Sequence, residues 1–276
     1  MHIITDSASL ITPEEAQELG ITVVPACVIV NGETYRDFID IGSEAFLSLL
    51  QKGHTPTSSQ PAIGDVMEIF ESVSDEILYL SIGDGLSGSY QSAAGARNCS
   101  EDPERIHVID TKTLAGPQRY LVKKALSLRE QGETLLTIQE QVMACIDTSV
   151  SFVIPADFDF LKRSGRLTPL AAKIGGMIRI VPVLTQTTDK TRITPFTVKR
   201  SCKKAISAII EHFKNIGVGE NHLISIGHAG VFEQALEAQK QILEHFPQTE
   251  TEVLQLSPSL ITHGGPSCIT IHAIHK

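Results

Sequence analysis

Short apolar runs alternate with helical patterns along most of this 276-residue chain. In the first half, apolar runs lie at residues 2–6, 76–82 and 105–110, and longer amphipathic stretches separate them. Apolar runs of this length indicate buried strands, and their alternation with helices is typical of a doubly wound, mostly parallel α/β sheet. We therefore expect an α/β fold in which a ligand binds at the carboxyl ends of the strands.

The length of the chain exceeds a single typical domain of roughly 100–150 residues, so two domains are expected. The pattern changes near Ser149, where a new series of strands and helices begins. We predict an N-terminal α/β domain over residues 1–148 and a C-terminal α/β domain over residues 149–276. In the second domain, two apolar segments that flank the TDK turn at 188–190 predict a pair of adjacent strands.

The composition narrows the possible partners. Hydrophobic residues make up 42% of the chain and charged residues 20%, which supports a folded core and argues against disorder. The formal net charge of −9 disfavours nucleic acid, since the chain has no long basic stripe. Five scattered cysteines without a CxxC pair indicate a reducing compartment, and the N-terminus lacks a signal-peptide pattern. We therefore expect a cytoplasmic protein.

A G-x-G-x-x-G pattern, formed by Gly83, Gly85 and Gly88, follows an apolar run. Glycines at a helix start provide unpaired N–H groups, which suit a negatively charged ligand without specifying it. Asp110 lies at about the distance expected of the acidic residue in a dinucleotide site, so a dinucleotide-dependent oxidoreductase is one hypothesis. Ser87 is either a ligand-binding hydroxyl or simply the N-cap of the next helix.

Two further segments carry polar side chains. Residues 55–60 read TPTSSQ, which contains more hydroxyls than the N-cap of the following helix needs. His263 lies in a turn-like THGG between two apolar strand segments, and its glycines permit a ligand to approach closely. His272 shares a strand face with Cys268, whereas His275 does not, so we expect no metal site.

Six segments, taken together and in order, resemble the DegV family. They are IITDSAS at 3–9, TSSQPAIGDV at 57–66, GLSGSYQSA at 85–93, VIDTKT at 108–113, RSGRL at 163–167 and ITHGGPSCI at 261–269. The resemblance extends from about residue 2 to residue 275. Members of that family are the fatty-acid-binding subunits of bacterial fatty acid kinase.

The resemblance implies a two-domain α/β protein that buries a long-chain, palmitate-like fatty acid between its domains. It implies no independent catalysis and no cofactor. The protein would instead present the carboxylate to a separate ATP-dependent fatty acid kinase, which forms the acyl phosphate. Transient contact with a membrane is compatible with this role.

On the matching motifs, the resemblance assigns the carboxylate of the ligand to Ser58, Ser87 and His263. It places Arg166 and Arg200 nearer the mouth that faces the kinase. Each hydroxyl at a helix start can donate a hydrogen bond to one shared carboxylate, which suits an anionic head group.

Two positions depart from the family pattern. Ser58 stands where the family usually has threonine, so the hydroxyl is kept and a methyl group is lost. Asp84 brings a carboxylate next to the proposed anion site. We expect Asp84 to point to solvent, because an inward-facing carboxylate would repel an anionic ligand. The dinucleotide hypothesis stays open as the alternative.

Overall fold

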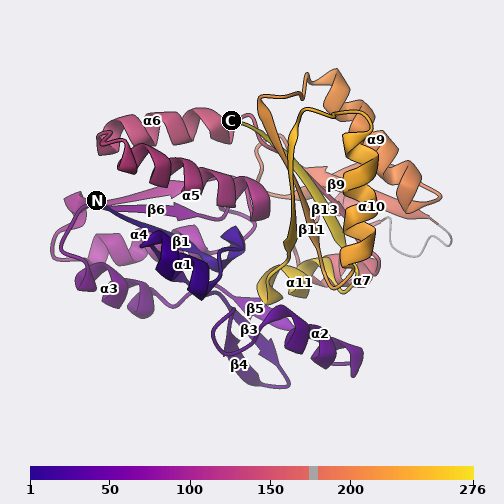
Figure 1. Cartoon of the computed structure of the whole chain (residues 1–276). Coiled ribbons are helices and arrows are strands. Elements are labelled where there is room, and N and C mark those ends of the chain that lie inside the picture. Colours follow the sequence, from indigo (N-terminus) through magenta and orange to yellow (C-terminus); the bar gives the residue numbers. More distant parts are fainter. Residues whose placement is uncertain (174–179) are drawn as a thin grey trace.

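The computed structural model describes residues 1–173 and 180–276 (Figure 1). Its first sheet has four parallel strands in the order β2-β1-β6-β7. The strands are β1 (His2–Asp6), β2 (Thr22–Val24), β6 (Ile77–Ser81) and β7 (Ile106–Asp110). The prediction of a mostly parallel N-terminal sheet with alternating helices is therefore confirmed.

Helices cover both faces of the first sheet. Successive strand residues point to opposite faces, so the apolar strands present side chains to the helices on each side. Ile4 and Tyr79 pack with α3 and α4, whereas Ile3 and Leu80 pack with α5 and α6. This double cover explains why every residue of β6 is buried. The elements are α3 (Ile63–Ser72), α4 (Ser89–Cys99), α5 (Ala115–Glu130), α6 (Leu135–Ile146) and the 3-10 helices η1 (Ser7–Ser9) and η2 (Pro103–Arg105).

Helix α1 (Pro13–Leu19) shows how local sequence sets an element. Thr12 caps it, and its Oγ1 accepts a hydrogen bond from Glu15 N at 3.3 Å. Pro13 occupies the first turn, where its missing N–H costs nothing. Gly20 ends the helix with a φ of 61°, a left-handed conformation that glycine adopts easily.

A small antiparallel sheet, β4-β3-β5, lies below the first sheet in Figure 1. Its hairpin turns at Asn31 and Gly32, with φ values of 55° and 83°, as the Asn-Gly pair predicts. Val28, Phe46 and Ile261 belong to one apolar cluster on this sheet. The elements are β3 (Cys27–Val30), β4 (Glu33–Arg36), β5 (Thr57–Ser59), α2 (Ser43–Gln51) and α11 (Pro258–Gly264).

The second sheet is mixed, with the order β10-β9-β8-β13-β11-β12 and one parallel pair, β11 with β12. The antiparallel pairing of β9 with β10 confirms the two adjacent strands expected around the TDK turn. Its strands are β8 (Val150–Ile154), β9 (Val181–Gln186), β10 (Ile193–Lys199), β11 (His222–His228), β12 (Glu250–Gln255) and β13 (Ile269–His275). The predicted boundary between residues 148 and 149 falls just before β8 and stays a prediction.

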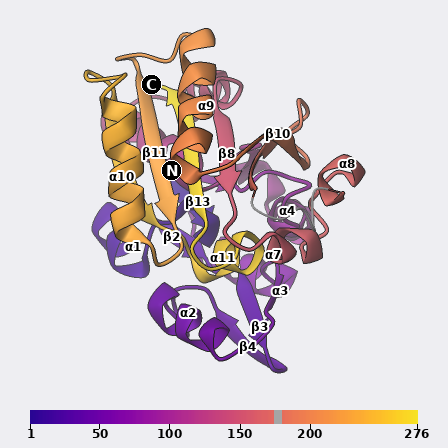
Figure 2. The same ribbon diagram turned by 90° about the vertical axis from the view of Figure 1, so that its right-hand side faces the viewer.

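Two helices cover one face of the second sheet (Figure 2): α9 (Cys202–Asn215) lies against β8, β9 and β10, and α10 (Phe232–Leu243) lies against β11 and β12. Ile209 of α9 and Ala235 of α10 share an apolar cluster with Ile224 of β11 and Ile271 of β13. The shorter helices α7 (Phe158–Arg163) and α8 (Pro169–Ala172) follow β8. The face of the second sheet that α9 and α10 cover therefore belongs to a packed hydrophobic core.

Helix α5 lies between the two sheets. Its buried Leu121 belongs to a cluster that contains Ile3 of the first sheet and Leu223 of the second. Gly116 carries no Cβ, so the helix can approach the side chain of Ser225 on β11 very closely. Both sheets are thus packed against one shared helix.

Candidate ligand-binding site

The first sheet has a topological switch point between β1 and β6. The chain leaves β1 toward β2 on one side and β6 toward β7 on the other, so the carboxyl ends of β1 and β6 border a crevice. The buried carboxylate of Asp6 accepts hydrogen bonds from Ile82 N at 2.8 Å and Gln118 Nε2 at 3.0 Å. Burial raises the pKa of Asp6, while these donors oppose that shift. Asp6 therefore holds the two strand ends together at the position where open α/β sheets bind ligands.

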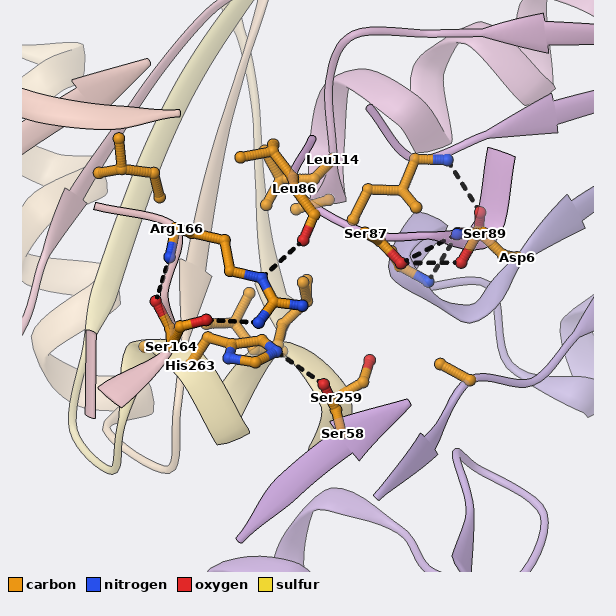
Figure 3. Close-up of a pocket in the computed structure, with 18 of the residues that line it drawn as sticks. Asp6, Ser58, Leu86, Ser87, Ser89, Leu114, Ser164, Arg166, Ser259 and His263 are labelled. Carbon is orange, nitrogen blue, oxygen red and sulfur yellow. Dashed lines mark hydrogen bonds between the residues drawn. The ribbon is translucent and has the colours of Figure 1, made fainter. Parts of the chain in front are cut away.

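A cavity opens at this crevice and reaches the second sheet (Figure 3). The volume of the cavity is about 120 Å³, whereas a single water needs roughly 10–15 Å³. The apolar part of the lining includes Ala8, Ile82, Leu86, Leu114, Val153 and Ile193. The polar part includes Ser58, Ser87, Ser89, Arg166, Ser259 and His263. The cavity therefore offers an apolar channel and a cluster of polar groups to one ligand.

The glycine-rich loop after β6 packs against other segments of the chain. A Cβ at Gly83 would lie 3.0 Å from the backbone of Lys112, and one at Gly88 would lie 2.8 Å from the side chain of Gln60. Gly85 has a φ of 85°, which disfavours any other residue. The glycines are thus required by contacts within the protein, and they need no pyrophosphate to explain them.

Asp110 and Asp84 both have local partners. The Asp110 carboxylate accepts hydrogen bonds from the backbone N–H groups of Asp84 at 3.0 Å and Lys112 at 2.9 Å. The Asp84 carboxylate accepts one from Gln91 Nε2 at 2.9 Å and, in the part of the chain that the structure describes, does not line the cavity. Asp84 therefore faces away from the cavity, as expected, and Asp110 stabilises the loop.

Ser87 lies in the loop just before α4. Its Oγ accepts a hydrogen bond from Ser89 N at 3.3 Å and lies 2.9 Å from Ser89 Oγ. Gly88 occupies the N-cap position of α4, without a side-chain cap, so Ser87 sits one residue before it. The Ser87 hydroxyl lines the cavity, where it can also donate to a ligand.

Ser58 lies on the edge strand β5 and pairs with Val28 of β3. The helix that follows begins at Ile63, with Ala62 at its N-cap and no side-chain cap. The expectation that a residue of the TPTSSQ segment caps this helix is therefore wrong. The hydroxyls of the segment do not serve the helix start, and that of Ser58 faces the cavity.

His263 lies in the last turn of α11, so the expected turn between two strands is instead a short helix. Ser257 and Pro258 explain this helix, because they supply a capping oxygen and a proline in the first turn. The imidazole Nε2 lies 2.8 Å from Ser58 Oγ, and either atom can donate, depending on the tautomer.

The environment of His263 keeps the imidazole neutral. One side of the ring faces the cavity and stays partly accessible. Protein atoms surround the rest, and this burial, together with the charge of Arg166, lowers the pKa of His263 to about 3. A neutral imidazole can donate one hydrogen bond and accept another, so the pair with Ser58 can offer a proton to a ligand oxygen.

Arg166 follows α7 and extends between Leu86 and His263 (Figure 3). Its Nε donates to the Leu86 carbonyl oxygen at 3.0 Å, and its Nη1 donates to the Ser164 carbonyl oxygen. Within residues 1–173 and 180–276, its Nη2 has no hydrogen-bond partner. Burial lowers the pKa of Arg166, but a guanidinium stays charged in proteins. The site therefore contains a fixed positive charge with a free N–H edge.

Four of the five residues assigned from the resemblance line this single cavity, namely Ser58, Ser87, Arg166 and His263. Arg200 does not belong to the lining in the described residues. It is exposed, directly after β10.

Four further serines line the cavity and were not among the predicted site residues: Ser59, Ser89, Ser164 and Ser259. Ser259 lies one helical turn before His263 on α11. The Ser-Pro-Ser order at 257–259 is a helix-start pattern that could have revealed it. Ser164 comes at the end of α7 and carries no comparable signal.

The chain is similar to known proteins along its whole length. The DegV family model matches residues 1–276. The chain belongs to the DegV family. The DegV domain-containing protein YteA of Lactococcus lactis is 31% identical over 284 aligned residues, which cover 100% of this chain and 98% of that protein.

Solved DegV structures share the fold. A DegV family protein from Thermus thermophilus, described for its fatty acid binding, is 27% identical, with a TM-score of 0.90 over 100% of this chain and 99% of its own. DegV of Bacillus subtilis, described as a fatty acid binding protein, is 26% identical, with a TM-score of 0.87 over 100% and 99%. The predicted fold class is therefore confirmed.

None of the helices described here combines the length and the apolar character that crossing a membrane requires.

Proposed function

We propose that this DegV protein binds a long-chain fatty acid, with the carboxylate at Ser58, Ser87 and His263 and the acyl chain along the apolar walls. The single observation that carries this proposal is the composition of one cavity, in which polar donors gather beside an apolar channel. The fatty acid binding described for the Thermus thermophilus and Bacillus subtilis relatives supports it.

The energetics favour such a ligand over a small anion. A hydrogen bond to a charged group contributes roughly 1.5–3 kcal/mol. Each buried CH₂ group adds roughly 0.8 kcal/mol, so an acyl chain of ordinary length supplies most of the affinity. The head-group donors then set the direction in which the ligand lies.

Arg166 lies beside the proposed carboxylate position. Its side chain lies next to that of His263 in the cavity (Figure 3), and its charge lowers the pKa of the imidazole. A guanidinium with a free N–H edge can pair with a carboxylate, and this pairing is strongest where water is excluded. Arg166 therefore has a role at the head group as well as at the mouth.

We infer further that the protein does not transform the ligand but presents it to an ATP-dependent fatty acid kinase in the cytoplasm. In that reaction the kinase transfers the γ-phosphoryl group of ATP to a carboxylate oxygen and releases ADP. The resemblance to the DegV family is the basis for proposing a kinase partner. The partial exposure of Ser58, Ser87, Arg166 and His263 supports it, because a partner must reach the carboxylate.

Extraction of the purified protein under denaturing conditions, followed by mass spectrometry, tests the ligand. We expect a long-chain fatty acid in near-stoichiometric amount. Release of no lipid, together with no binding of added palmitate and a clear thermal shift with NAD, would instead favour the dinucleotide hypothesis.

Reconstitution tests the partner. The palmitate-loaded protein is mixed with ATP and a purified bacterial fatty acid kinase, and the acyl phosphate is trapped with hydroxylamine. We expect acyl hydroxamate only when both proteins are present. Formation of the product by the DegV protein alone would show independent catalysis and contradict the proposal.

A further inference from the structure

A buried carboxylate outside the cavity joins the segments that carry the proposed head-group residues. Asp37 follows β4 and is only 1% exposed. It belongs to neither the apolar channel nor the polar lining in the residues described. The Asp37 carboxylate has no part in the proposed ligand binding, so its burial needs another explanation.

Asp37 accepts hydrogen bonds from two distant segments. Ser7 Oγ of η1 donates to Asp37 Oδ2 at 2.8 Å. Ser259 of α11 donates through its Oγ to Oδ2 at 2.5 Å and through its backbone N–H to Oδ1 at 3.3 Å. Ser7 Oγ in turn accepts from Ala26 N at 3.0 Å, directly before β3. One carboxylate thus holds η1, α11 and the small sheet together.

These segments carry the two partners of the head-group pair. Ser259 lies one turn before His263 on the same helix, and the small sheet contains β5, which carries Ser58. The hydrogen bond between Ser58 and His263 crosses the same interface as the Asp37–Ser259 contact. A shift of α11 against the sheet would break both.

We propose that Asp37 is a positioning residue that fixes the distance between Ser58 and His263 for carboxylate binding. This inference rests on the proposed function. Burial of a carboxylate is costly, and it also raises the pKa of Asp37 to about 6. An apolar residue would avoid that cost, but it could not hold three donors from two distant segments in one geometry.

A double-mutant cycle separates positioning from general stabilisation. The dissociation constant for palmitate is measured for the wild type, Asp37→Asn, Ser58→Ala and the double variant. We expect Asp37→Asn to weaken binding about tenfold in the wild-type background and less than twofold in the Ser58→Ala background. An equal loss in both backgrounds would overturn the proposal, because the effect would not pass through the pair.

Three additional measurements make the result unambiguous. Glu252→Gln serves as the matched control, because Glu252 also accepts a serine hydroxyl, that of Ser225 at 2.8 Å, but does not line the cavity in the described residues. It should leave palmitate binding unchanged. If Asp37→Asn does not fold, Ser7→Ala replaces it in the cycle, because it removes one of the same donors.

The third measurement needs no ligand. The ¹⁵N shifts of the His263 ring report its hydrogen bond to Ser58, and Asp37→Asn should move them toward those of Ser58→Ala. Unchanged shifts would contradict the positioning role. Failure of the wild type to bind palmitate, with the shifts moving as expected, would reject the proposed function while keeping the structural role of Asp37.

Discussion

Ser58 Oγ and His263 Nε2 lie 2.8 Å apart, although the two residues are 205 positions apart along the chain. One belongs to an edge strand of the small sheet and the other to the last turn of α11. This contact closes the polar end of the cavity with groups from both ends of the sequence. The predictions below test the ligand site that it defines.

Ser87→Ala should weaken palmitate binding by about ten- to a hundredfold, because it removes a hydrogen bond to a charged acceptor worth roughly 1.5–3 kcal/mol. The midpoint of thermal unfolding should change little, since the Ser87 hydroxyl bonds only to Ser89 in the described residues. Isothermal titration calorimetry measures the affinity. Ser48→Ala, an exposed serine on α2, is the control. Equal affinities for both variants would remove Ser87 from the head-group site.

Arg166→Met should raise the pKa of His263 from about 3 toward its ordinary value, because one of the two causes of the shift is removed. Burial remains, so the pKa stays below 6.5. NMR titration of the His263 ring in the ligand-free protein measures the change. Arg163→Met is the control, since Arg163 is exposed and stacks on Phe160 at 4.7 Å. The same shift in both variants would argue against a local charge effect.

Val153→Phe should reduce the affinity for long acyl chains more than for short ones, because Val153 on β8 lines the apolar part of the cavity. A larger side chain there occupies space that methylene groups of the ligand would fill. Competition between a fatty acid of 10 carbons and one of 18 carbons (roughly 0.8 kcal/mol per CH₂) measures the preference. Val198→Phe on the exposed side of β10 should keep the wild-type order. A uniform loss for both chain lengths would show general disruption instead.

The free energy of unfolding should fall as the pH falls from 6.5 toward 3, in part because of His272. Burial lowers the pKa of this imidazole to about 3, and its Nδ1 lies 2.9 Å from Ser151 Oγ. In that window the unfolded chain binds the proton and the folded protein does not, so acid favours unfolding. Asp37 acts in the opposite direction, since its raised pKa of about 6 makes the folded state bind a proton first.

His272→Gln isolates the histidine contribution, because glutamine keeps a hydrogen-bonding group and does not titrate. Denaturant unfolding at pH 7 and pH 4.5 should show a smaller acid-induced loss of stability for the variant than for the wild type. His245→Gln, at an exposed position, should follow the wild type. A variant curve parallel to the wild-type curve would show that His272 does not resist protonation.

Local chemistry made much of the fold predictable from the sequence. The short apolar runs that alternate with helical patterns predicted a mostly parallel sheet. Local residues also explain the two ends of α1 and the turn of the β3–β4 hairpin. Two hydroxyl residues of the candidate site, Ser58 and Ser87, could be named from the sequence. Their convergence could not be predicted, because a contact between Ser58 and His263 depends on how distant segments pack.

Two expectations about the site were wrong and one residue was missed. A strand at Ser58 replaced the expected helix cap, because pairing with β3 outweighed the local pattern. A helix at His263 replaced the expected turn, because Ser257 and Pro258 start a helix ahead of the glycines. No sequence pattern singled out Asp37, since only the folded chain brings Ser7 and Ser259 to it. Apolar residues that line a cavity look, in sequence, like those of a solid core.

The position of α5 has a consequence for ligand exchange. Its buried side chains contact residues of both sheets, and Gly116 brings its backbone against Ser225. Moving the two sheets apart would expose this shared core to water, and the free-energy cost would be comparable to that of unfolding. If the proposed fatty acid binds here, we therefore expect it to enter and leave by local displacement at the mouth of the cavity, while both sheets stay packed against α5.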